Sequence, residues 1–131
     1  TVTWDLHLPE HLPKIALDAA ALHRALLNIF TNAAEALETL PGENPKRVRV
    51  TAVHDRGRGS LRLIISDNGP GLLPEERERM FEPYFSRKKG GTGLGLAIVK
   101  SIVADHRGTI RAVGAQGGGT SMVLEFPLFR A

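Results

Sequence analysis

The sequence predicts an α+β fold in which a largely antiparallel sheet carries helices on one face. Runs with strand periodicity and runs with helix periodicity are mixed without regular β-α-β alternation, which argues against a doubly wound parallel sheet. The chain has 131 residues, 42% of them hydrophobic and 24% charged, which is the size and composition of one globular domain. We therefore expect residues 1–131 to form a single domain around one core.

The N-terminal part is expected to hold one strand and one long helix. Residues 2–8 alternate between apolar and polar side chains, which predicts a half-buried strand that ends at Pro9. A short extended piece is expected at 14–17. Asp18 is a typical N-cap, and the apolar residues after it recur at helical spacing until Pro41 ends the run.

Two further strands and a short helix are expected in the middle of the chain. The runs RVRVTAV (47–53) and SLRLIISD (60–67) have strand composition and are close enough to form a hairpin. Pro74 begins a short charged helix, PEERERMF, and residues 82–93 have no buried periodicity, so a loop is expected there.

The C-terminal third should contain one helix and two strands. A second long helix is expected at about 94–106, with Gly108 ending it. The runs TIRAVGA (109–115) and TSMVLEFPL (120–128) then predict a final pair of strands.

Composition argues against several classes of protein. No run of about 18 apolar residues is present, and the first residues lack a basic segment followed by an apolar one, so neither a membrane span nor an export signal is expected. The absence of cysteine removes disulfides and thiolate metal sites and favours the cytoplasm. The net charge of +3 comes with only 5% aromatic residues, which disfavours nucleic-acid binding.

Two asparagines mark one face of the first long helix. Asn28 and Asn32 are four residues apart and project from the same side, beside the apolar stripe. Asparagine is a poor residue in the middle of a helix because its side chain competes for backbone hydrogen bonds. Mg²⁺ prefers oxygen ligands and shares its coordination with substrate phosphates, so one or two amide oxygens suffice. A magnesium site and a pair of surface asparagines are both open interpretations at this point.

The segment DNGPG (67–71) follows an apolar strand. Asn-Gly and Pro-Gly are strong turn signals, so a plain turn is the simplest interpretation. Asp67 can also accept a hydrogen bond from the exocyclic amine of adenine, while Gly69 and Gly71 let the base approach the backbone. Guanine would present a carbonyl oxygen there, which favours ATP over GTP. Thr120, at the start of the last strand, can reach the base side with its hydroxyl.

Glycines crowd the start of the second long helix. Gly91, Gly93 and Gly95 can present successive N–H groups to phosphate oxygens, and the helix dipole favours the anion. A Walker A loop would need Lys followed by Ser or Thr after its last glycine, and a dinucleotide fingerprint would need a preceding strand. Neither motif fits this run.

The loop before these glycines is basic and aromatic. Lys88 and Lys89 belong to a run of three basic residues that can reach a terminal phosphate, of which at most one is assigned a definite role. Basic loop tips are also commonplace solvated charge. Phe81 and Phe85 either anchor a mobile lid over about 73–93 or belong to the core.

The order and spacing of these segments resemble those of sensor histidine kinases over nearly the whole chain. LLNIFTNAAEAL (26–37) resembles the N box, DNGPGL (67–72) the G1 box, FEPYFS (81–86) the F box, GGTGLGLAIVK (90–100) the G2 box, and GGGTSMVLEF (117–126) the final glycine motif. The run FEPYFSRKKGGTGLGLAIVK is similar to the nitrogen-regulation type of sensor kinase.

The resemblance implies a fold and a set of site residues. The wider superfamily of gyrase, Hsp90, histidine kinase and MutL ATPases has a two-layer α/β sandwich, the Bergerat-type ATP-binding fold, with a mixed sheet under three helices. Asn32 would be the main Mg²⁺ ligand and Asn28 would assist, and the two would act in catalysis together with Lys88. The residues implied in binding ATP are Asn28, Asn32, Asp67, Gly69, Gly71, Phe81, Lys88, Lys89, Gly91, Thr92, Gly93, Leu94, Gly95, Leu96 and Thr120.

One position distinguishes the branches of the superfamily. Hydrolytic members that resemble gyrase carry a glutamate that activates water where this chain has Asn28, and an amide cannot take that proton. Transfer of the γ-phosphoryl group to an external nucleophile is therefore expected. The resemblance implies that this nucleophile is a histidine on a separate helical dimerisation domain. None of the five histidines of this chain lies in the acidic helical context of such a phosphoacceptor.

The expected function is that of the catalytic, ATP-binding domain of a two-component sensor histidine kinase, cut from a longer chain and using ATP and Mg²⁺. Its expected partners are the dimerisation domain and, through that domain, a response regulator. The fragment itself is expected to be monomeric and cytoplasmic, without nucleic-acid or direct membrane contact, and its parent is either soluble or membrane-anchored. A stand-alone ATPase and a nucleotide-gated interaction module of the same superfamily stay open as alternatives.

Overall fold

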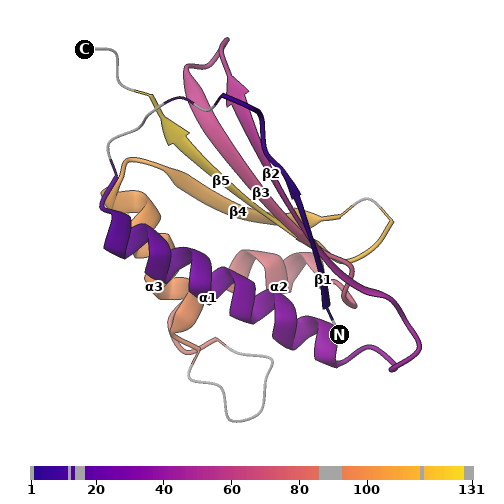
Figure 1. The fold of residues 1–131 in the computed structure, drawn as a ribbon. Helices are drawn as coiled ribbons and strands as arrows, with labels where there is room; N and C mark the ends of the chain where they lie inside the picture. Colours follow the sequence, from indigo (N-terminus) through magenta and orange to yellow (C-terminus); the bar gives the residue numbers. More distant parts are fainter. Residues whose placement is uncertain (1, 12, 14–16, 86–92, 116, 129–131) are drawn as a thin grey trace.

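A computed structural model describes residues 2–11, 13, 17–85, 93–115 and 117–128 (Figure 1). Along the chain the elements are β1 (Val2–His7), α1 (Ala19–Glu38), β2 (Lys46–Asp55), β3 (Ser60–Asp67), α2 (Pro74–Arg79), α3 (Gly95–Asp105), β4 (Thr109–Gly114) and β5 (Thr120–Pro127).

The described strands form one mixed sheet in the order β1-β2-β3-β5-β4. β1 runs parallel to β2, and every other neighbouring pair is antiparallel. The helices α1, α2 and α3 lie together on one face of this sheet (Figure 1). The α+β expectation, the β2–β3 hairpin and the mixed sheet under helices are all confirmed.

The element boundaries differ slightly from those expected. The first strand ends at His7 rather than at residue 8, and the short charged helix ends at Arg79 before Met80 and Phe81. Of the extended piece expected at 14–17, only Leu17 is described, and it lies outside any strand. None of the helices among the described residues is both long enough and apolar enough to cross a bilayer.

α1 begins at the N-cap that its sequence predicts. The Asp18 side chain accepts a hydrogen bond from the Ala21 N–H at 3.1 Å, which satisfies one of the free donors of the first turn. Its buried face recurs every four residues, as expected for a helix that packs along one stripe. The buried residues of α1 are Ala25, Ile29, Ala33 and Leu37.

His106 ties the end of α3 to the start of α1. The Asp18 backbone N–H donates to Nε2 of His106 at 2.9 Å, and Nδ1 of the same ring lies 2.7 Å from the carbonyl oxygen of Ile102. The ring thus joins two helix ends that are far apart in sequence. The packing of α1 on α3 is held at this end by a directional bond as well as by apolar contact.

The helix side of the sheet holds the apolar core, whereas the other face carries polar and charged side chains such as Arg62 and Glu125 beside apolar ones such as Ile64 and Val123. Side chains alternate between the two faces along each strand. Val48, Ile65, Leu124 and Phe126 are almost fully buried against the helices. The opposite face is not covered by a helix, which antiparallel sheets tolerate when it carries polar groups.

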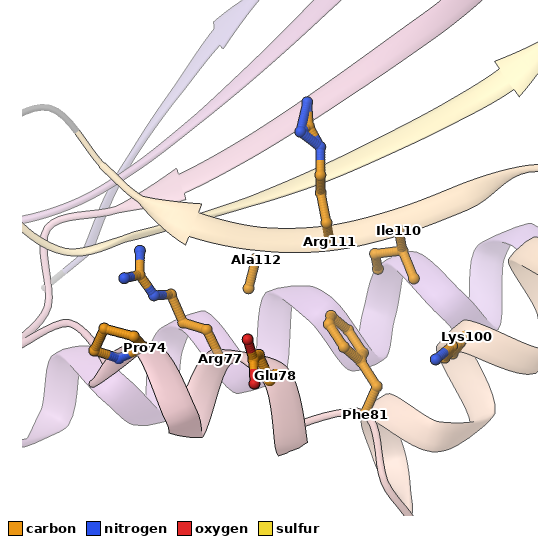
Figure 2. A pocket seen from close by; sticks show the side chains of 8 residues that line it. All are labelled: Pro74, Arg77, Glu78, Phe81, Lys100, Ile110, Arg111 and Ala112. Atoms are coloured by element: carbon orange, nitrogen blue, oxygen red, sulfur yellow. The ribbon is translucent and has the colours of Figure 1, made fainter.

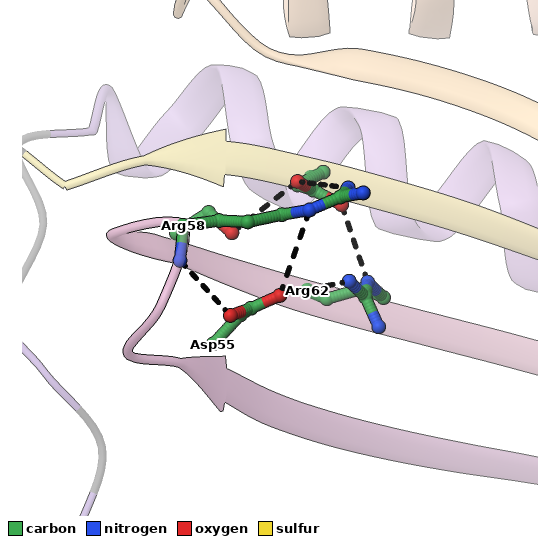
Figure 3. Close-up of polar contacts among 5 residues, drawn as sticks. Asp55, Arg58 and Arg62 are labelled. Atoms are coloured by element: carbon green, nitrogen blue, oxygen red, sulfur yellow. Dashed lines mark hydrogen bonds and ion pairs between the residues drawn. The ribbon is translucent and has the colours of Figure 1, made fainter.

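Charged residues join the β2–β3 hairpin to β5 on this uncovered face (Figure 3). Arg62 lies at the centre, with Nη2 3.2 Å from Oδ2 of Asp55 and Nε 3.2 Å from Oε2 of Glu125. Nη1 of Arg58 lies 3.6 Å from Oε1 of Glu125. Partial burial raises the pKa of Glu125, but the hydrogen bond and charge of Arg62 outweigh it and hold that pKa below its ordinary value.

Replacement of Glu125 should change how stability depends on pH. Because the pKa of Glu125 is lower in the folded state, its ionised form stabilises the fold above the unfolded value of 4.5, and this stability is lost as pH falls through the folded pKa. Glu125→Gln should lower the free energy of unfolding at neutral pH by about 1 kcal/mol. It should also flatten the decline of stability in acid, measured by urea denaturation at a series of pH values.

The matched control is Glu43→Gln, at an exposed position in the loop before β2. This variant should follow the wild-type pH profile. An acid decline of Glu125→Gln that runs parallel to that of the wild type would contradict the assigned role of the ion-pair network.

Candidate functional site

The two asparagines of α1 are half-buried beside the start of α3. Nδ2 of Asn28 donates to the carbonyl oxygen of Gly95 at 3.3 Å, so the amide bridges α1 and the glycine-rich helix start. Asn32 is one turn further along the same face of α1. Asn28 and Gly95, two of the residues predicted to bind ATP, therefore lie together in space.

The donors on this face suit a hard cation that is shared with phosphates. Within the part of the chain that the structure describes, no group of three or more His, Cys, Asp or Glu side chains is gathered as a metal site. The amide oxygens of Asn28 and Asn32 are neutral hard ligands, of the kind that Mg²⁺ accepts when phosphates and water complete its shell. The residues present therefore fit an Mg²⁺ ion that arrives with a nucleotide.

Asp67 ends β3 as an almost buried carboxylate, with 8% of its surface exposed. The Gly69 N–H donates to Oδ1 of Asp67 at 2.9 Å, and the backbone N–H of Thr120 forms a second hydrogen bond to the carboxylate. Burial raises the pKa of Asp67, and the two backbone hydrogen bonds counteract this shift in part. The result is an oriented acceptor in a site of low solvent access.

Gly69 brings this carboxylate and α1 together. A Cβ atom at Gly69 would lie 2.9 Å from Oδ1 of Asp67 and 3.4 Å from Cβ of Ala36. Ala36 is one turn after Asn32 on the same face of α1. The turn after β3 therefore lies in contact with α1, and the atom that a Cβ at Gly69 would crowd is Oδ1 of Asp67.

The two helix-start glycines differ in what surrounds them. Gly93 has φ 72°, and a Cβ atom there would lie 2.5 Å from the carbonyl carbon of Tyr84, whose N–H donates to the Gly93 oxygen at 2.8 Å. The backbone of Gly93, just before α3, therefore packs on the F-box segment and is hydrogen-bonded to it. Among the described residues, no atom beyond its chain neighbours and its own helix backbone lies within 4 Å of where a Cβ atom on Gly95 would be. Gly93 thus has a packing reason to be glycine, and the described neighbours of Gly95 give no such reason, so its expected phosphate contact stays a prediction.

Phe81 is a core residue, 8% exposed, which agrees with the packing alternative for the aromatic segment. In Figure 2 its ring is directed toward β4, between Ala112 and Ile110, and it borders a hollow of about 400 Å³ that is lined by α2, α3 and β4. Arg77 and Lys100 line the same hollow. Neither Asp67 nor the asparagines of α1 line it. The expected contact of Phe81 with ATP stays a prediction.

The remaining predicted residues divide into two groups. Leu96 packs against the core, and Leu94 is half-buried at the N-cap of α3. The others fall in 86–92, outside the described residues, so their expected phosphate contacts stay predictions. These are Lys88, Lys89, Gly91 and Thr92.

The GGGT segment packs on the turn after β3. Thr120 is 6% exposed and is the register partner of Asp67 in the β3–β5 pair. Gly119 has φ 92°, and a Cβ atom there would collide with the Asp67 carbonyl oxygen and lie 2.9 Å from Cα of Asn68. Gly71, with φ 80°, faces Gly119 from the other side of the turn. In the sequence Gly119 is one of three consecutive glycines, and no local signal distinguishes it from the other two.

Two neighbouring glycine substitutions should therefore differ in cost. Gly119→Ala should lower the free energy of unfolding by about 3 kcal/mol or more, because the added methyl group meets backbone atoms that cannot move independently. Gly118→Ala should cost about 1–2 kcal/mol, since its φ of 109° is strained for alanine but no atom of the described residues beyond its chain neighbours lies within 4 Å of the new Cβ. Urea denaturation followed by circular dichroism measures both, and equal losses would contradict the close contact.

Residues 17–130 match the family of histidine kinase-, DNA gyrase B-, and HSP90-like ATPases. The chain belongs to this family. Its N box, G1 turn and G2 helix are thus those of an ATP-binding domain, and the resemblance found in the sequence is confirmed.

Relatives of known function are sensor kinases. The chain is 38% identical over 117 residues to the sensor histidine kinase ZraS of Klebsiella oxytoca, a match that covers 89% of this chain and 24% of ZraS. It is 37% identical over 126 residues to the sensory histidine kinase/phosphatase NtrB of Vibrio alginolyticus, covering 91% of this chain and 35% of NtrB. The chain thus spans about a quarter to a third of the length of these relatives.

Solved structures share the whole fold. The mycobacterial sensor histidine kinase MprB superposes with a TM-score of 0.81 at 34% identity, covering 99% of this chain and 86% of that one. Full-length ShkA, in complex with AMPPNP, superposes with a TM-score of 0.82 at 32% identity, covering 99% of this chain and 26% of ShkA. The fold is therefore that of a histidine kinase catalytic domain, in agreement with the sequence prediction.

Proposed function

We propose that this chain is the catalytic domain of a longer two-component sensor kinase, and that it transfers the γ-phosphoryl group of Mg-ATP to a histidine on a separate dimerisation domain. The observation that carries the proposal is Asn28. An amide occupies the place where a hydrolytic relative needs a carboxylate, and its nitrogen is already bonded to Gly95 at 3.3 Å. Because an amide oxygen cannot take a proton at neutral pH, transfer to a nucleophile activated elsewhere is favoured over hydrolysis.

Each described site residue has a defined task in this proposal. Asp67, ionised, accepts the exocyclic amine of adenine, and its oriented carboxylate distinguishes adenine from a base that has a carbonyl there. Asn32 holds Mg²⁺ with help from Asn28, and the ion, when bound, neutralises phosphate charge. Gly95 lies at the positive end of α3, where it contacts phosphate.

The rest of the parent protein and its partners are inferred from the relatives of this chain. Their greater length supports a parent kinase that carries the phosphoacceptor histidine, with Lys88 of this chain at the terminal phosphate during transfer. A response regulator is then the downstream acceptor, reached through the dimerisation domain. The domain works in the cytoplasm, where Mg-ATP is abundant, whether its parent is soluble or membrane-anchored.

Removal of the main metal ligand should uncouple ATP binding from magnesium. Asn32→Ala should weaken ATP binding in the presence of Mg²⁺ by about tenfold or more, because a hard oxygen ligand is lost. Binding measured in EDTA should change little. Isothermal titration calorimetry of the 131-residue chain with and without Mg²⁺ measures both affinities.

Thr31→Ala is the matched control, since Thr31 is the exposed neighbour on α1. It should leave both affinities unchanged. An Asn32→Ala variant that binds Mg-ATP as tightly as the wild type would refute the metal assignment.

The direction of phosphoryl transfer can be tested with γ-labelled ATP. The chain alone should neither become labelled nor release ADP steadily. Addition of the helical dimerisation domain of its own parent kinase should give label on that domain, as a phosphohistidine that is lost in acid and stable in alkali. Steady ADP release by the chain alone would favour a stand-alone ATPase of the same family.

A further inference from the structure

The turn after β3 is fastened to the neighbouring strand by Asn68, a residue with no task in the proposed function. Its Oδ1 accepts the N–H of Arg47 at 2.7 Å, and its Nδ2 donates to the carbonyl oxygen of Pro45 at 2.7 Å. Its own backbone N–H donates to the carbonyl oxygen of Arg47 at 3.2 Å. One exposed asparagine thus makes three hydrogen bonds to the start of β2.

Two of these bonds form the next rung of the β2–β3 ladder, in which one backbone bond is kept and the other is replaced by a bond to the side chain. The last paired residues are Val48 and Asp67, so Arg47 and Asn68 are the next pair in register. Such a pair would exchange two backbone hydrogen bonds. Here the Arg47 N–H bonds instead to the side-chain oxygen of Asn68. The side chain stands in for its own main-chain carbonyl, so Arg47 keeps a partner while the main chain leaves the sheet.

The direction of this exit matters for Asp67. Directly after Asn68 the chain turns so that the N–H of Gly69 reaches Oδ1 of Asp67 at 2.9 Å. Gly69 also comes against Ala36 of α1. A strand that continued straight along β2 would carry residue 69 away from both groups. The exit at Asn68 is therefore what supplies one of the two backbone donors that orient the carboxylate.

The other side of the turn is held by steric contact. Gly119 packs on the carbonyl group of Asp67, and the Thr120 N–H supplies the second donor to the carboxylate. These groups belong to β5 and the loop before it, whereas Asn68 ties the turn to β2. The carboxylate of Asp67 is thus oriented from two neighbouring strands, and the side chain of Asn68 holds the turn on the β2 side.

We propose that Asn68 is a positioning residue for purine selectivity. By replacing one of the two bonds of a ladder rung with its side chain, it holds Gly69 against Asp67 so that the carboxylate keeps the orientation in which it accepts the amine of adenine. This inference rests on the proposed function, because it deepens the adenine role of Asp67. Asn68 itself need not touch the nucleotide.

The test compares ATP with ITP, whose base has a carbonyl oxygen in place of the amine. The dissociation constants of both nucleotides are measured by calorimetry for the 131-residue chain with Mg²⁺. Asn68→Ala should reduce the preference for ATP over ITP by about threefold to tenfold, in the direction of Asp67→Asn, since one oriented hydrogen bond is weakened. Asn68→Asp keeps an acceptor for the Arg47 N–H and should retain most of the preference.

Ser66→Ala is the matched control for lost stability. Ser66 lies next to Asp67 on the opposite face of the sheet, and its Oγ is 2.6 Å from Oγ of Ser121. This variant loses a hydrogen bond at the same strand end but should keep the wild-type ratio of ATP to ITP affinity. A reduced ratio in Ser66→Ala would assign the effect to general loosening and overturn the proposal.

The outcomes separate this inference from the proposed function. A wild-type chain that binds both nucleotides equally would overturn the adenine role of Asp67 and the inference with it. A wild-type chain that prefers ATP, with Asn68→Ala showing the same preference, would overturn the inference alone. Equal loss in Asn68→Ala and Asn68→Asp would overturn the ladder argument, because the bond from Arg47 would then have no influence on selectivity.

Discussion

The packing of α1 against the sheet and α3 is the interaction on which the rest of the structure depends. Ala25, Ile29 and Ala33 are buried on one stripe of that helix, which fixes its rotation about its own axis. With the rotation fixed, Asn28 faces the start of α3, and Asn32 lies one turn further along the same face, half-buried. The chemistry of the site is thus a consequence of where the apolar residues of α1 are placed.

The sequence predicts the elements well because each has a strong local signal. The N-cap at Asp18, the four-residue recurrence in α1 and the strand pattern before Asp67 depend on neighbours in the chain, and these features hold in three dimensions. The meeting of Asn28 with Gly95 is also anticipated, although only by analogy of motif order with a known family. What local pattern does not contain is the order of strands in the sheet.

The residues that the sequence leaves without a role act through long-range contacts. Asn68 reads as part of a turn dipeptide, and nothing local indicates that its side chain completes a rung with Arg47, which lies 21 positions earlier. In the sequence Gly119 is one of three similar glycines. A side chain cannot be accommodated there because its Cβ atom would collide with the backbone of Asp67 on another strand. Phe81, for which the sequence leaves a lid anchor and core packing both open, packs in the core beside β4.

The parallel pairing of β1 with β2 has a consequence for the order in which the molecule assembles. β2 and β3 are joined by a tight connection and can pair as soon as that short loop closes, whereas β1 is separated from β2 by the whole of α1. The entropy lost in closing that long loop is recovered only when α1 already has a surface to rest on. We therefore expect β1, with Trp4 placed edge-on against Phe30, to be added last during folding and to detach first during partial unfolding.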